Sequence, residues 1–135
     1  MKASIIIILS ICLASCFNNY KSGKCAFEYS VSVGENLSIS QADVETAVSS
    51  VMKKEAAEFG IDILIFGYSA GKEVFSYTGS EDKPAAKLFP GKIDSVVKIK
   101  VKNEIKKTVF ISASGNNKDE ILSAFALKLR KEFCE

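Results

Sequence analysis

The stretch 95–114 constrains the fold more than any other part of this chain of 135 residues. Apolar and polar residues alternate in two consecutive runs, 95–102 and 108–114. The first run places Val97, Ile99 and Val101 on one side and Lys98, Lys100 and Lys102 on the other; the second places Val109, Ile111 and Ala113 opposite Thr108, Phe110, Ser112 and Ser114. A period of two indicates strands with one buried face. We therefore predict a β-hairpin whose turn spans 103–107.

Three further strands are expected earlier in the chain. Residues 25–33 alternate in the same way, with Phe27 and Tyr29 on the apolar side. Residues 61–68 are apolar on both faces, which is typical of a strand inside a sheet. A turn at 70–72 would then bring residues 73–78 back as the partner of 61–68.

Two helices are expected. The first begins at Ser40, with Asp43 three residues later as a variant of the capping box, and ends at Gly60. Its apolar stripe consists of Val44, Ala47, Val48, Val51, Met52 and Phe59. The second begins at Asn117, with Glu120 three residues later, and carries the stripe Ile121, Leu122, Phe125, Ala126, Leu129 and Phe133.

The resulting element order, β-α-β-β-β-β-α, predicts an α+β fold. We expect a mostly antiparallel sheet of four or five strands, with both amphipathic helices packed on one face. The first strand, the first helix and the second strand can form a right-handed crossover.

The loop 79–92 is the least regular segment and contains both prolines of the chain. Residues 84–89 can form a helical turn with Pro84 at its first position. Leu88 and Phe89 are either a plug that packs onto the core, which is the commoner outcome, or an exposed contact site.

The N-terminus has the three parts of a secretory signal: Lys2, an apolar segment from Ala3 to Leu13, and the small residues Ala14 and Ser15. A membrane-spanning helix needs about 17–25 apolar residues. The apolar run here stops before Asn18, so we expect a cleavable signal at 1–15 and no permanent span.

The tetrad Leu13-Ala14-Ser15-Cys16 resembles the lipobox of bacterial lipoproteins. The resemblance implies cleavage before Cys16, a diacylglycerol on its thiol, and an acyl chain such as palmitate on the new amino group. Two or more chains give stable anchoring, whereas one does not. The alternative is a signal without lipidation. Residues 16–24 would be a short tether and 25–135 a single domain in the bacterial cell envelope, on the outer membrane in preference to the inner.

Cys25 and Cys134 remain after Cys12 is removed with the signal and Cys16 is acylated. An oxidising envelope favours a disulfide between them. The bond would close a loop of about 110 residues, worth at most about 5 kcal/mol in the chain-entropy model. The alternative is two free thiols.

Catalysis and cofactors are not expected. The chain has no histidine, which removes Ser-His and Cys-His pairs and makes a zinc site improbable. The available carboxylates, Asp62, Glu73, Glu81, Asp82 and Asp94, look solvated or stand at strand starts. Removing residues 1–15 takes away one of the 18 basic residues, leaving 17 against 16 acidic ones. This near-neutral balance gives no reason to expect a nucleic-acid partner.

The local charge is more informative. We predict a partner-binding surface on the hairpin, formed by Lys98, Lys100, Lys102, Lys106, Lys107 and Phe110, together with Leu88 and Phe89 of the loop. Such a surface can contact an anionic lipid or glycolipid, or an acidic protein. The alternative is a solvated strand face, or lysines that protect a sheet edge from aggregation.

The element order also resembles the small lipoprotein partner of outer-membrane lipopolysaccharide assembly. It is equally similar to the curli-secretion and penicillin-binding-protein-activator lipoproteins, in which a phrase like 60–67 follows a helix. The resemblance implies a fold and assigns no functional residue. We therefore expect a non-enzymatic, lipid-anchored protein that binds an envelope component through 95–114 and 79–92. The alternative is a ligand module with a pocket lined by Phe27, Tyr29, Phe66 and Phe75.

Overall fold

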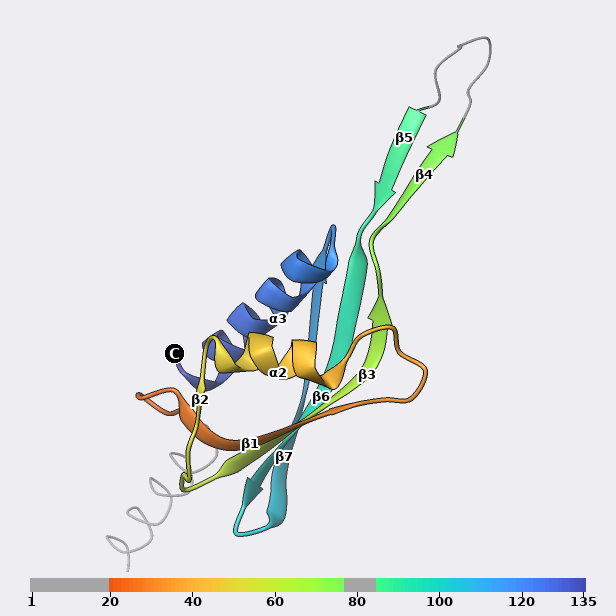
Figure 1. Cartoon of the computed structure of the whole chain (residues 1–135). Coiled ribbons are helices and arrows are strands. Elements are labelled where there is room, and N and C mark those ends of the chain that lie inside the picture. The colour runs from red at the N-terminus through yellow and green to blue at the C-terminus, as the bar shows by residue number, and fades with distance from the viewer. Residues whose placement is uncertain (1–19, 77–84) are drawn as a thin grey trace, which may run out of the picture.

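The computed structural model describes residues 20–76 and 85–135 (Figure 1). The expected signal, Cys16 and the residues 77–84 lie outside this range. The strands are β1 (Ala26–Val33), β2 (Lys53–Lys54), β3 (Gly60–Ser69), β4 (Lys72–Ser76), β5 (Ala85–Phe89), β6 (Gly91–Val101) and β7 (Glu104–Gly115), and the helices are α2 (Gln41–Ser49) and α3 (Lys118–Phe133). No helix in the described range is long and apolar enough to cross a membrane.

Five strands form the main sheet in the order β2-β1-β3-β6-β7. β1 runs parallel to β2 and β3, while β6 runs antiparallel to both of its neighbours, β3 and β7. The α+β class is confirmed, and the sheet is mixed. The parallel pairing of β1 with β3 is the one expected for a crossover through the first helix.

The predicted pairing of residues 61–68 with residues 73–78 is wrong. β3 pairs with β6, which places Ile61 opposite Ile99 and Ile63 opposite Val97. β4 instead continues in the direction of β3 and pairs with β5, so 70–72 is a link and not a hairpin turn. The expected helical turn within 84–89 is also wrong over 85–89, which form β5.

The core lies between one face of the sheet and both helices, as predicted. Alternate residues of β1, β3, β6 and β7 are buried together with the apolar stripes of α2 and α3 in one cluster. Ser95 is the buried polar residue of this layer, and its hydroxyl donates to the carbonyl of Ile111 at 2.8 Å. The residues between the buried ones face away from the helices, so no helix among residues 20–76 and 85–135 covers the second face of the sheet, which we call the uncovered face.

The first helix is shorter than predicted, because α2 ends at Ser49 instead of continuing to Gly60. Ser49 and Ser50 donate their hydroxyls to the carbonyls of Thr46 and Ala47, a competition with the backbone that favours helix ends. The chain then forms β2 beside β1. Met52 still reaches the core although it lies beyond the helix.

Both predicted N-caps are confirmed. The Ser40 hydroxyl accepts from the N–H of Asp43 at 3.1 Å, and the Asn117 side chain accepts from the N–H of Glu120 at 2.9 Å. The Glu120 carboxylate accepts from the N–H of Asn116 at 2.8 Å, which completes a variant of the capping box.

The predicted disulfide between Cys25 and Cys134 is confirmed. Their Cα atoms are 4.9 Å apart, within the range of protein disulfides. The bond joins the start of β1 to the end of α3, 109 residues apart in sequence. The Ser22 N–H donates to the Phe133 carbonyl at 2.8 Å beside it. The two ends of the domain are therefore held together.

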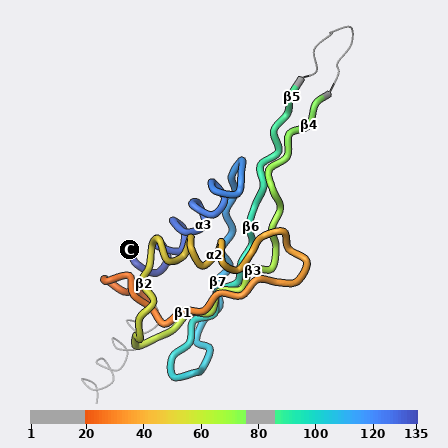
Figure 2. The backbone as a smooth tube through the Cα atoms, in the orientation of Figure 1, coloured from red at the N-terminus to blue at the C-terminus, as the bar shows by residue number. Residues whose placement is uncertain are grey.

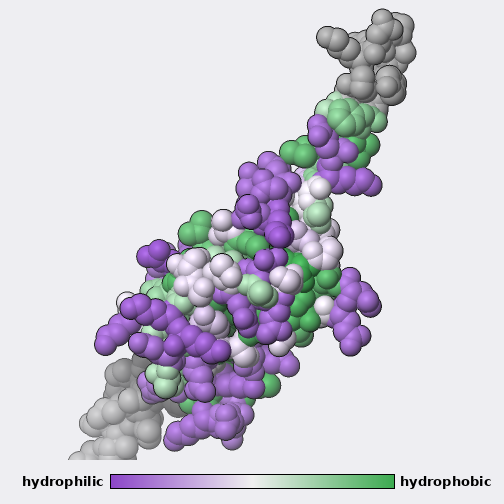
Figure 3. Space-filling model, in the orientation of Figure 1, coloured by the Kyte–Doolittle hydropathy of each residue, from purple (hydrophilic) through white to green (hydrophobic). Residues whose placement is uncertain are grey.

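β4 and β5 form a two-stranded arm that extends away from the body of the molecule (Figure 2). The arm grows from β3 and β6, so the four strands make one long hairpin. Hydrophobic and hydrophilic residues are mixed along its surface (Figure 3). An isolated two-stranded ribbon is at best marginally stable in water, which makes the arm a candidate contact element.

Candidate binding surface

The uncovered face of the sheet carries a row of apolar side chains. Leu64 on β3 pairs with Val96 on β6, which pairs with Phe110 on β7. Because directly opposite residues share a face, these side chains lie side by side on the face away from the helices. Phe110 is 71% exposed. We call Leu64, Phe66, Val96 and Phe110 the open-face cluster.

Phe66 enters this cluster through an irregularity in β3. The pairing of β3 with β6 shifts between Ile65 and Gly67, as at a β-bulge. The alternation before the shift puts Phe66 on the same face as Leu64, and the side chain is 52% exposed. Its exposure was not foreseen, because the uniformly apolar stretch 61–68 contains no polar residue after Asp62 to mark its outer side.

A polar network borders the open-face cluster at Asp62. The Ser30 hydroxyl donates to its carboxylate at 2.8 Å, and Lys100 forms an ion pair with it. Partial burial alone would raise the pKa of Asp62, but the hydrogen bonds from Lys100 and Ser30 and the charges of Lys100 and Lys98 together lower it. On the other side of the cluster, the Ser112 hydroxyl donates to Asp94 at 2.7 Å.

The predicted lysines do not form one stripe. The turn is the two-residue pair Lys102–Asn103, both with positive φ, so Lys106 and Lys107 lie on β7 and not in a turn. Lys107 pairs with the buried Ile99 and therefore belongs to the helix side of the sheet. Lys98 and Lys100 of β6 lie on the strand face beside the open-face cluster.

Two of these lysines have acidic partners. Lys100 pairs with Asp62, and Lys106 pairs with Glu104 at 2.9 Å. The ion pairs of the described residues include no partner for Lys98, Lys102 or Lys107. The local charge is therefore less positive than the count of lysines indicates.

The plug expected at Leu88 and Phe89 is wrong. Both side chains lie on the arm and are exposed, Leu88 by 50%. The pairing puts Leu88 and Phe75 on one face of the ribbon and Phe89 and Val74 on the other. The Lys87 ammonium lies 5.2 Å from the centre of the Phe89 ring. The arm consequently has apolar side chains on both faces.

The aromatic pocket expected for a small ligand is not formed. Phe27 is fully buried in the core, Tyr29 is nearly so, and Phe66 lies on the opposite face of the sheet. Phe75 is on the arm. The four residues therefore do not line one cavity, and the interpretation as a ligand module is wrong for these residues.

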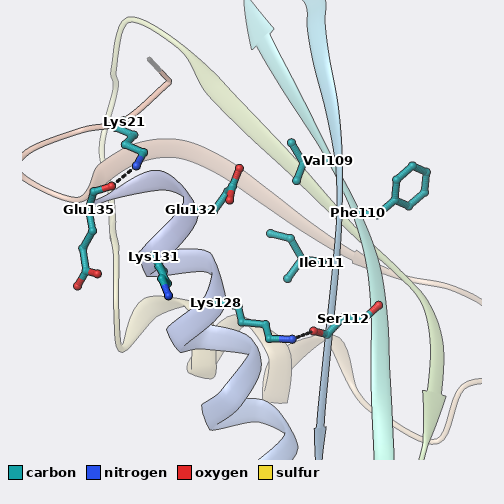
Figure 4. Close-up of a pocket in the computed structure, with 9 residues that line it drawn as sticks. All are labelled: Lys21, Val109, Phe110, Ile111, Ser112, Lys128, Lys131, Glu132 and Glu135. Atoms are coloured by element: carbon teal, nitrogen blue, oxygen red, sulfur yellow. Dashed lines mark hydrogen bonds between the residues drawn. The ribbon is translucent and has the colours of Figure 1, made fainter. Parts of the chain in front are cut away.

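A groove of about 520 Å³ runs between β7 and the last turns of α3 (Figure 4). Val109 and Ile111 point toward the helix, whereas Phe110 points away from it. Lys128, Lys131 and Glu132 line the opposite wall. Lys128 donates to the backbone carbonyl of Ser112. This groove could not be predicted from the sequence, because it depends on how α3 packs beside the edge strand β7.

No protein-family model matches the chain, and no curated protein matches it in sequence. Among solved structures, it is similar to a minor lipoprotein from Acinetobacter baumannii, with a TM-score of 0.43 and 9% identity. That match covers 80% of this chain and 91% of the other. At this level the likeness assigns neither a function nor a site residue.

Proposed function

We propose that this chain is a non-enzymatic, lipid-anchored protein of the bacterial cell envelope, which binds another envelope protein through the uncovered face of its sheet. The observation that carries the proposal is the open-face cluster. Monomeric proteins rarely leave contiguous apolar patches uncovered, and such patches with polar rims mark interaction sites. The anchor is supported by the tetrad at 13–16, and the short tether would hold the domain close to the bilayer.

The composition of the face favours a protein over a lipid. An anionic membrane surface attracts a concentrated positive charge. Here Lys100 is neutralised by Asp62, and Asp94 lies on the same face. An apolar centre bordered by mixed polar groups is the arrangement of protein–protein interfaces. The arm, with exposed Phe75 and Leu88, is a second contact element of the same long hairpin.

The anchor is tested by the intact mass of protein extracted from membranes. The expected mass corresponds to a chain that begins at Cys16 plus acyl chains. A Cys16→Ser variant should lose both the acyl mass and the membrane fraction. A mass without acyl chains would overturn the anchor without bearing on the binding face.

Binding is tested by placing a photo-crosslinking residue at Phe66 and, as a control, at Leu127. Both side chains are more than half exposed, but Leu127 lies on α3, on the helix side of the molecule. Crosslinking in intact cells should give a discrete higher-mass product from position 66 and none from position 127. Equal products from both positions, or none from either, would contradict the proposal.

A further inference from the structure

β7 is a long strand at the edge of the main sheet, with no further strand paired to its outer side. It spans 12 residues at one end of the sheet, whereas the opposite edge, β2, spans two. A long edge offers unpaired N–H and C=O groups to another strand.

The backbone groups that point away from β6 belong to the even-numbered residues of β7. The carbonyl of Ile111 accepts from Ser95 on β6, so it points into the sheet. The carbonyl of Ser112 accepts from Lys128 instead, so it points outward. Because backbone groups alternate in direction along an antiparallel strand, Thr108 and Phe110 also present theirs to the free edge.

The groove beside this edge has room for the side chains of an added strand. A strand next to β7 would place alternate side chains toward α3, where Val109 and Ile111 form the floor of the groove of about 520 Å³. The intervening side chains would continue the open-face cluster beyond Phe110. The edge therefore fits a strand that has apolar residues on the groove side and an apolar residue beside Phe110 on the open face.

We propose that the strand is β7 of a second copy of this chain, antiparallel and centred on Phe110. In that register the two Phe110 rings are neighbours on the open face, and Thr108 of each copy is opposite Ser112 of the other. Val109 of each copy is opposite Ile111 of the other on the helix side. Cross-strand pairs of aromatic and β-branched residues are the favourable ones in sheets.

The charges agree with this two-fold arrangement. Lys107 of each copy is opposite Ala113 of the other, so the lysines of β7 do not face one another. The helix wall of the groove carries both signs, Lys128 and Lys131 beside Glu132. A surface with both signs can complement its own copy across a two-fold axis, the commonest symmetry of homo-oligomers. In the dimer, the N–H of Thr108 of the other copy takes the place of Lys128 at the Ser112 carbonyl.

The inference goes beyond the proposed function and does not depend on it. Pairing through β7 would leave the uncovered face accessible and join the two open-face clusters into one surface across the ten strands of the two main sheets. Two acylated chains would also sit in the membrane together.

Sedimentation of the full chain in detergent, with the detergent mass subtracted, tests the dimer. The wild type should have the mass of two chains. Phe110→Pro should halve it while leaving the thermal unfolding midpoint nearly unchanged, since the lost N–H faces outward and the pairing with β6 is kept. The control Phe66→Ser removes another exposed aromatic away from the edge and should remain dimeric. A monomeric wild type overturns the proposal, as does a Phe110→Pro variant that stays dimeric.

A second variant tests the register in native membranes without relying on that substitution. Phe110→Cys should form a reducible dimer under mild oxidation, because the two positions face each other at the symmetry axis. Phe66→Cys, on the same face but two strands inward, should not. A dimer band from both or from neither overturns the register. Crosslinking of Phe110→Cys to a different protein alone would assign the edge to that partner and overturn self-pairing.

Discussion

At the scale of single residues, hydrogen bonds and an ion pair hold two aspartates at the border of the open-face cluster. Asp62 is held by Ser30 and Lys100, and Asp94 by Ser112, so the carboxylates lie along the border of the apolar cluster. Phe66 and Phe110 have no such counterpart and remain exposed. The two aspartates that border the cluster are thus paired within the chain, whereas its aromatic side chains are left exposed.

Asp62 gives a pH-dependent prediction. Its folded pKa lies below the unfolded value of about 3.9, so the carboxylate adds stability above that value and loses the effect as pH falls through the folded pKa. Because the pair is half-exposed, Asp62→Asn should cost at most about 1 kcal/mol at neutral pH, and the difference should shrink in acid. Urea unfolding of both proteins at neutral and acidic pH measures this.

The control for Asp62 is Glu28→Gln. Glu28 is an exposed carboxylate of β1 with no ion pair among the described residues. We expect a smaller change in the free energy of unfolding at neutral pH, because no ion pair is lost. A difference for Asp62→Asn that persists undiminished in acid would show that packing, and not the charge, is responsible.

At the scale of elements, local patterning predicts faces better than it predicts partners. The alternation in 25–33, 95–102 and 108–114 identified the buried sides of β1, β6 and β7 correctly. A strand with one buried face needs an apolar residue at every second position, so the pattern reports burial directly. The partner of β3 could not be predicted. Both 73–78 and 95–102 have strand-like sequences, and the choice depends on long-range packing of Ile61 and Ile63 against β6.

The helix length and the exposed residues were missed for related reasons. The apolar stripe to Phe59 mimicked a helix, because Met52 reaches the core from the segment between α2 and β2, and Phe59 packs against it from the loop after β2. For Leu88 and Phe89 the sequence left open a buried plug, the commoner outcome for apolar residues, and an exposed contact site; both side chains are exposed. Pattern alone contains no information about whether a strand pair is part of the body or extends away from it.

The base of the arm provides the prediction at this scale. A Cβ added at Gly71 would lie 2.0 Å from the backbone oxygen of Asn116, so the link between β3 and β4 passes directly against the start of α3. Gly71→Ala should therefore destabilise the protein by about 1–3 kcal/mol, as overpacking does. The control Gly23→Ala has no atom within 4 Å of the added carbon and should be neutral. Chemical denaturation of both variants distinguishes them; equal stability would place the link away from Asn116.

At the scale of the whole molecule, the two faces of the main sheet differ, because one is covered by helices and the other is not. α2 and α3 both cover the same face, and the bond between Cys25 and Cys134 fixes the ends of the chain beside each other. The tether would therefore emerge next to the C-terminus of α3. This asymmetry leaves a whole sheet face for a partner, which the sequence pattern indicated only through Phe110.

Loss of the disulfide should lower the stability of the domain strongly. Replacing both Cys25 and Cys134 with Ala should lower the free energy of unfolding by about 2–5 kcal/mol, because the closed loop spans most of the domain. Unfolding of the wild type with and without a reductant measures the same quantity independently. The reductant should have no effect on the double variant. Equal stability of the oxidised and reduced wild type would contradict the structural role of the bond.

The most direct test of the central claim is carbene footprinting of the protein in native membranes and after purification in detergent. If the uncovered face binds an envelope protein, Leu64 and Phe66 should be labelled less in membranes than after purification, whereas Leu127 on α3 should be labelled equally in both. Equal labelling of Leu64 and Phe66 in the two states would mean that the face is vacant in the cell and would contradict the account.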